Sequence, residues 1–229
     1  MNKILILHGW TYSTESWRPV ADALRALGAD VELLEIPGLT DGTNPVWTLE
    51  DYVEWLKGKI PDGQPATLIG HSNGGRISLA FAAKYPHSVA RLILLDSAGI
   101  PARGLRALKK NIFRVVAKVG GALVTSERFR DLLYKFARVG DYRKATPEMR
   151  QTMANLLSVD LSKVLHKIQC PTLIIWGAND TTTLLSDGEL MHRGIRASRM
   201  IVIPDARHSP HITHRDKITE ILTNEINSQ

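Results

Sequence analysis

Ala66-Thr67-Leu68-Ile69-Gly70-His71-Ser72-Asn73-Gly74-Gly75-Arg76 is the stretch around which the chain is organised. Its first half is a short apolar run that stops at glycine, and further apolar residues at helical spacing follow as far as Ala83. This pattern predicts a strand that turns directly into a helix at Ser72. Residues 70–74 fit the pattern G-x-S-x-G, in which a serine sits on a strained strand-to-helix turn. Such a turn exposes the hydroxyl, and the helix N-terminus behind it favours developing negative charge.

Two other interpretations of the same stretch have to be weighed. A glycine-flanked serine after a strand is also compatible with an ordinary tight turn, so chemical partners for Ser72 must be found elsewhere in the chain. The segment from Gly70 to Gly75 has the spacing of a phosphate-binding loop, but Arg76-Ile77 stands where that loop has Lys followed by Ser or Thr. The sequence therefore disfavours a nucleotide site.

The composition is that of an ordinary globular protein. The 229 residues, of which 44% are hydrophobic and 23% charged, are enough for one full domain core with an inserted subdomain. A single cysteine, Cys170, excludes an intramolecular disulfide and a multi-cysteine metal site, and we expect it to be buried. The N-terminus lacks the features of a signal peptide and no run reaches membrane-spanning length, so we expect a cytoplasmic protein.

Short apolar runs alternate with helical patterns along most of the chain. This alternation predicts a mostly parallel, about six-stranded sheet with helices on both faces. The charged residues within 31–36 suit an edge strand. Besides the run at 66–70, the predicted strands are Ile4 to Leu7, Val31 to Ile36, Val89 to Leu95, Pro171 to Gly177 and Met200 to Ile203.

The alternation stops after residue 99 and resumes near residue 166. We therefore predict a core formed by residues 1–99 and 166–229, interrupted by an all-helical insertion over 100–165. Residues 100–155 contain thirteen Lys or Arg and four Asp or Glu, a net charge of +9, whereas the whole chain carries +6. Solvated charges outside apolar helix faces are the simplest explanation. Guidance of anionic substrates and loose adhesion to an anionic membrane stay open, while no nucleic-acid-binding motif is present.

A serine nucleophile needs a base, and the base needs an acid that fixes its tautomer. Asp180 follows the strand that ends at Gly177, and His208 follows the next strand. The order Ser, Asp, His, with each residue in a loop after a strand, favours these two as the partners of Ser72. Rivals exist for both partners. Asp96 ends the strand before the insertion and is the rival acid, while Asp180 could instead be a helix cap, a role for which Thr181 to Thr183 compete. Two further histidines, His211 and His214, compete with His208 as the base.

With these residues in place, the chain resembles the α/β-hydrolase superfamily, in particular serine carboxylesterases with a helical lid. The resemblance covers nearly the whole chain. It implies that the backbone N–H groups of Trp10 and Asn73 form an oxyanion hole, because His8-Gly9-Trp10 is similar to the family's oxyanion loop. It also implies that the insertion at 100–165 is a lid over the site.

The chain departs from the family pattern at three points. It begins at what would be the third strand, so the N-terminal hairpin is expected to be missing. His8-Gly9 is not followed by further glycines, which argues against a lipase-type oxyanion loop. Arg207 stands where a glycine often precedes the base.

The predicted function is hydrolysis of small to medium carboxylic esters, and lactones are included as candidate substrates. The mechanism is an acyl-enzyme that requires neither a metal nor an organic cofactor. A hydrolase of carbon–carbon bonds next to a ketone and a catalytically silent ligand-binding relative are the alternatives. The expected partner is a small-molecule ester, and the sequence does not predict the oligomeric state.

Overall fold

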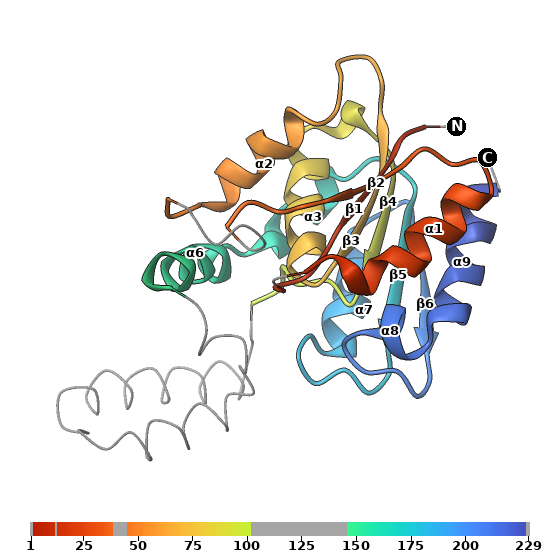
Figure 1. Ribbon diagram of the computed structural model, residues 1–229. Coiled ribbons are helices and arrows are strands. Elements are labelled where there is room, and N and C mark those ends of the chain that lie inside the picture. The colour runs from red at the N-terminus through yellow and green to blue at the C-terminus, as the bar shows by residue number, and fades with distance from the viewer. Residues whose placement is uncertain (1, 12, 39–44, 102–145, 228–229) are drawn as a thin grey trace.

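The computed structural model describes residues 2–11, 13–38, 45–101 and 146–227 (Figure 1). The core is a six-stranded sheet with the strand order β2-β1-β3-β4-β5-β6, and every neighbouring pair is parallel. The predicted α/β architecture is therefore confirmed. The strands are β1 (Ile4–Leu7), β2 (Val31–Leu34), β3 (Ala66–His71), β4 (Val89–Leu95), β5 (Thr172–Gly177) and β6 (Ser198–Ile203).

The two edge strands differ from the sequence prediction in length. Strand β2 lies at the edge, as predicted, but it ends at Leu34 rather than at Ile36. The reason is a change of partner, because the Ile36 amide donates to Nε2 of the His8 side chain and so leaves the strand ladder. At the opposite edge, β6 begins two residues earlier than predicted, at the polar Ser198.

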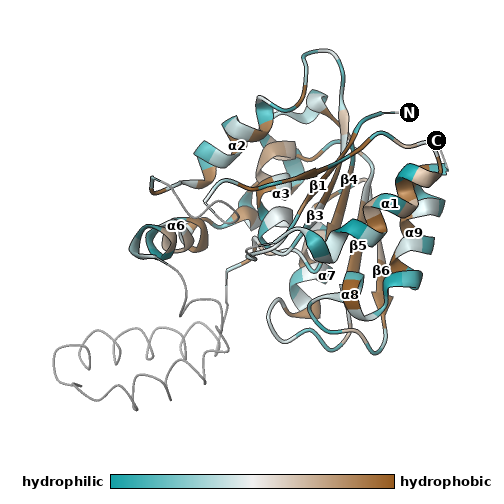
Figure 2. Ribbon diagram, in the orientation of Figure 1, coloured by the Kyte–Doolittle hydropathy of each residue, from teal (hydrophilic) through white to brown (hydrophobic). Residues whose placement is uncertain are grey.

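Helices cover both faces of the sheet, and the alternation of side chains along the strands explains how. In β1, Ile4 and Ile6 pack into the apolar cluster under α1 (Arg18–Ala26) and α9 (Arg215–Asn227). Leu5 and Leu7 point the other way. They pack into the cluster under α2 (Leu49–Lys57), α3 (Asn73–Lys84) and α7 (Leu185–Gly194). Figure 2 shows the hydrophobic strands between these two layers.

Short elements complete the described part of the chain. Helix α8 (Pro210–Thr213) precedes α9, and 3-10 helices occupy Glu15–Trp17, Pro86–Ser88, Leu161–Lys163 and Leu165–Lys167. None of the described helices is long and apolar enough to cross a membrane.

Only the last part of the predicted insertion belongs to the described residues. It contains α6 (Pro147–Ser158) and the two 3-10 turns at 161–167, and no strand lies between residues 146 and 171. Hydrogen bonds hold α6 to the segment before α2, since Trp47 N–H donates to the Thr152 hydroxyl and the Asn155 amide donates to the Trp47 carbonyl. Residues 102–145, and with them most of the predicted lid and its basic residues, lie outside the described residues.

The backbone is closely packed where β3 joins α3. A Cβ atom on Gly74 would lie 2.1 Å from the Leu7 carbonyl oxygen, and one on Gly70 would lie 2.6 Å from the Gly75 Cα. The obstacles are backbone atoms of β1 and α3, which cannot rotate away. Glycine is therefore required at both positions by close packing of the helix against the sheet.

We expect Gly74→Ala to lower the free energy of unfolding by about 3 kcal/mol or more, because overpacking against backbone has no side-chain rotation to relieve it. Urea unfolding followed by circular dichroism measures the change. Gly58→Ala is the matched control, since its new Cβ would lie at an ordinary 3.4 Å from the Trp55 carbonyl oxygen. Equal unfolding midpoints for the two variants would contradict this account of the turn.

Candidate active site

Ser72 occupies the turn between β3 and α3 in a strained backbone conformation. Its φ is 51° and its ψ is −112°, a region that residues with a Cβ rarely adopt. Backbone bonds hold it there: Ser72 N–H donates to the Leu95 carbonyl, and the Ser72 carbonyl accepts from the N–H groups of Arg76 and Ala98. The predicted strand-to-helix turn is thus present, and it fixes the serine side chain at the carboxyl end of the sheet.

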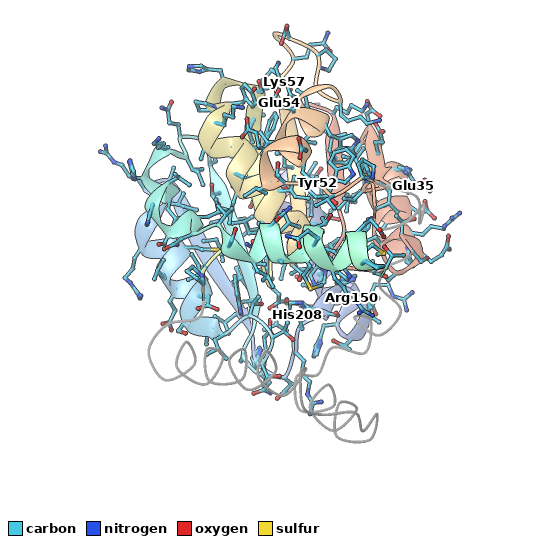
Figure 3. The ribbon with its side chains drawn as sticks, turned by 90° about the vertical axis from the view of Figure 1, so that its left-hand side faces the viewer. Glu35, Tyr52, Glu54, Lys57, Arg150 and His208 are labelled. Carbon is cyan, nitrogen blue, oxygen red and sulfur yellow. The ribbon has the colours of Figure 1, made fainter. Side chains whose placement is uncertain are left out.

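Ser72, His208 and Asp180 form one hydrogen-bonded chain. His208 Nε2 lies 2.9 Å from Ser72 Oγ, and His208 Nδ1 lies 2.8 Å from Asp180 Oδ2. A carboxylate only accepts, so Nδ1 carries the proton and the neutral ring presents Nε2 as an acceptor for the serine hydroxyl. This is the arrangement in which an imidazole can take the serine proton. Figure 3, viewed from the α6 side, labels His208 just below that helix.

Asp180 is 4% exposed and is held as a carboxylate by its neighbours. Burial alone would raise its pKa, but hydrogen bonds from His208, Thr183 and the Thr182 amide outweigh burial and lower the pKa below its ordinary value. Oδ1 accepts from the amides of Thr182 and Thr183 at 2.7 and 3.2 Å, and Oδ2 accepts from the Thr183 hydroxyl at 2.7 Å. The threonines that looked like competing helix caps therefore orient this carboxylate.

Asp96, the rival acid, contacts no histidine among the described residues. Its Oδ1 accepts the Gly177 N–H at 2.8 Å, which ties the end of β4 to the end of β5. The side chain is fully buried. Burial, opposed by the Gly177 hydrogen bond and reinforced by the negative charge of Asp180, raises the Asp96 pKa to about 8. Asp96 is thus a neutral structural group at neutral pH.

The rival histidines do not reach Ser72. His211 is buried and stacks on Trp17 with ring centroids 4.4 Å apart, and burial lowers its pKa to about 4. His214 Nδ1 lies 2.9 Å from the hydroxyl of the adjacent Thr213. His71, which the sequence analysis did not single out, has a supporting role instead.

His71 supports the loop that carries the base. Its Nε2 lies 2.7 Å from the His208 carbonyl oxygen, and because a carbonyl only accepts, Nε2 must carry the proton. Burial, with the nearby histidines adding to it, lowers the His71 pKa well below its ordinary value, so the ring stays neutral. Arg207 does not prevent the loop from bringing His208 to Ser72.

The two predicted oxyanion donors come to the same cavity from separate parts of the chain. Trp10 and Asn73 line the same cavity as the serine, and Asn73 begins α3. The loop that carries Trp10 is held by His8, whose Nδ1–H donates to the Gly9 carbonyl at 2.7 Å while Nε2 accepts from Ile36. The structure thus brings together all five residues predicted for the site.

Two cavities meet at Ser72. One, of about 410 Å³, has a mainly apolar lining that includes Ile100, Leu156 and Val159. The other, of about 370 Å³, is lined by His208 and His71. Within the described ranges, no three His, Cys, Asp or Glu side chains are arranged to hold a metal ion. Ser72, hydrogen-bonded to His208, thus lines both of these spaces.

Comparisons with known proteins agree with the fold. A family model described as alpha/beta hydrolase fold matches residues 2–215. The pimeloyl-acyl-carrier protein methyl ester esterase of Shewanella woodyi is 25% identical over 98% of this chain and 94% of its own length. Its namesake from Chromobacterium violaceum is 26% identical over 99% of this chain and 94% of its own length. The crystal structure of the enol-lactonase from Burkholderia xenovorans LB400 superposes with a TM-score of 0.73 at 19% identity, covering 99% of this chain and 91% of that one.

We expect Asp96→Asn to remove part of the pH dependence of stability. In wild type the pKa of Asp96 in the folded state is about 8, above the ordinary value near 4 of the unfolded state. The protonated group therefore contributes fully to the stability of the fold below about pH 4, and this contribution declines as the pH rises towards 8. An asparagine stays neutral and keeps the oxygen that accepts from Gly177. Between pH 5 and 8, wild type should therefore lose at least about 5 °C more in Tm than Asp96→Asn does.

Thermal unfolding at both pH values measures this difference. The exposed Asp205→Asn is the matched control, and it should follow wild type. An Asp96→Asn protein with the same pH slope as wild type would mean that Asp96 is ionised in the folded state.

Proposed function

The chain belongs to the alpha/beta hydrolase fold family, and on that premise we propose that it is a serine hydrolase that cleaves carboxylic esters through an acyl-enzyme. The observation that carries the proposal is the continuous hydrogen-bonded chain from Ser72 through His208 to Asp180. Relatives that match over nearly the whole chain are named as esterases, which supports the same reaction class.

In the proposed reaction, Ser72 Oγ attacks the ester carbonyl carbon while its proton passes to His208 Nε2. The charge that develops on the carbonyl oxygen is stabilised by the N–H groups of Trp10 and Asn73 at the start of α3. His208 then gives the proton to the departing alcohol oxygen, and an acyl-enzyme remains. A water molecule then attacks the acyl carbon and gives a proton to His208. His208 returns this proton to Ser72 Oγ as the bond between Oγ and the acyl carbon breaks, and the carboxylic acid is released.

The two cavities suggest how the ester lies. The leaving alcohol must receive its proton from His208, which lines the 370 Å³ cavity but not the 410 Å³ cavity. We therefore assign the alcohol to the smaller cavity and the acyl chain to the larger, apolar one. The size of the larger cavity suits small to medium acyl chains.

Ester hydrolysis is favoured over the alternatives by the activity in the names of the relatives, which are methyl ester esterases. By analogy, we propose that esters of small alcohols are the best substrates. Lactones and ketone-type carbon–carbon substrates stay predictions of the sequence, because no contact in the site favours either.

Ser72→Ala should abolish ester turnover and leave the fold intact, because loss of a triad nucleophile costs on the order of a million-fold in kcat. Hydrolysis of p-nitrophenyl acetate, butyrate and hexanoate measures the effect and ranks acyl length at the same time. Ser158→Ala, an exposed change on α6, is the control and should keep full activity. Substantial turnover by purified, folded Ser72→Ala would overturn the mechanism.

Replacing each of the two buried carboxyl groups separately by an amide should distinguish their roles. Asp180→Asn should lower kcat by about ten-thousandfold, because the amide no longer fixes the tautomer of His208. Asp96→Asn should change kcat by less than about tenfold at pH 7, because the group that it replaces is already neutral. The same ester assay decides, and a severe loss in Asp96→Asn with a mild one in Asp180→Asn would reverse the assignment.

A further inference from the structure

Arg76 is a buried cation inside the acyl cavity. It lies on α3, one turn after Ser72, and its amide donates to the Ser72 carbonyl. Only 5% of the residue is exposed, yet it lines the 410 Å³ cavity. Arginine is almost never buried in this way unless it is paired, so its partners are informative.

The described residues satisfy few of the hydrogen-bond donors of the guanidinium. Nη1 donates to the Leu156 carbonyl near the C-terminal end of α6, where the carbonyls of a helix lack partners within the helix. Nε is buried and has no hydrogen-bond partner within the part of the chain that the structure describes. A guanidinium has five N–H donors in a planar fork, so one carbonyl leaves most of its capacity unused.

No carboxylate of the described residues pairs with Arg76. Burial alone lowers its pKa, to about 10, without any acidic neighbour opposing the change, and the group therefore stays charged at neutral pH. Asp187 lines the same cavity, but its Oδ2 accepts the Leu184 N–H at the start of α7. An unpaired buried charge is costly, and a bound anion would compensate it.

We propose that Arg76 binds a carboxylate on the acyl part of the substrate, so that the preferred substrates are monoesters of short dicarboxylic acids. The assignment rests on the proposed ester hydrolysis and on the acyl chain lying in the larger cavity. A carboxylate matches the planar fork of a guanidinium, and the pair would lie in a cavity with a mainly apolar lining, where such hydrogen bonds are strong. Because Arg76 is only one turn from Ser72, a short spacer between the two carbonyl groups fits best.

The test compares the monomethyl and dimethyl esters of glutaric acid, which differ in one negative charge. In wild type, kcat/KM should be higher for the monoanion. In Arg76→Met the ratio of monoanion to neutral ester should fall at least about tenfold, mainly through KM, and Arg76→Lys should keep part of the preference. Arg193→Met removes an exposed charge on α7 and should leave the ratio unchanged.

A purely structural role as a cap of α6 predicts a different result, because it would affect both esters alike. An unchanged ratio in folded Arg76→Met therefore overturns the proposal, and so does an equal fall in Arg193→Met. If Arg76→Met does not fold, competitive inhibition of wild type decides: glutarate should bind about tenfold more tightly than the neutral glutaramide, and equal inhibition refutes the subsite.

Failure of the proposed ester hydrolysis would give a different result from failure of the Arg76 subsite. If wild type hydrolyses neither ester, the esterase assignment fails, whereas calorimetric titration with glutarate still tests the subsite. Binding of glutarate that is weakened in Arg76→Lys and lost in Arg76→Met would support the anion site even then, and no glutarate binding to wild type would overturn it.

Discussion

The strained turn at Ser72 is the constraint on which the site depends. A left-handed backbone at a serine is unfavourable by itself, and it persists here because its N–H and carbonyl are bonded to Leu95, Ala98 and Arg76 while glycines on either side allow the backbones to touch. The same turn presents Oγ to His208 and sets the N-terminus of α3 beside it. The fold and the chemistry of the site thus depend on the same backbone turn at Ser72.

The proposed base and the proposed acid reach this serine because parallel strands end at a common edge. The loops after β5 and β6 carry Asp180 and His208, and these strands are neighbours in the sheet. Two buried carboxyl groups at this edge take opposite protonation states. Asp180 is stabilised as an anion by four hydrogen bonds, whereas Asp96 accepts one and is driven neutral by burial. The environment decides which of the two can assist a histidine.

Much of the fold and of the candidate site could be predicted from the sequence, because both depend on local sequence patterns. The apolar runs of β1 and β4 gave exact strand limits, and the order of Ser72, Asp180 and His208 identified the three residues that the structure brings together. What escaped prediction depends on contacts between distant segments. The bonds of His71 to the His208 carbonyl and of Arg76 to the Leu156 carbonyl join residues more than 75 positions apart, and no spacing rule indicates them. For the same reason β2 was predicted too long, since its end is set by His8 rather than by its own residues.

The central claim is that Ser72 is the nucleophile of an acyl-transfer reaction, and stoichiometric labelling tests it most directly. A p-nitrophenyl alkylphosphonate ester mimics the tetrahedral intermediate and traps an activated serine. We predict release of one equivalent of p-nitrophenol per chain, with the phosphonyl mass on the peptide that carries Ser72. Absence of labelling at full occupancy of the site, or a label on any other residue, would contradict the account.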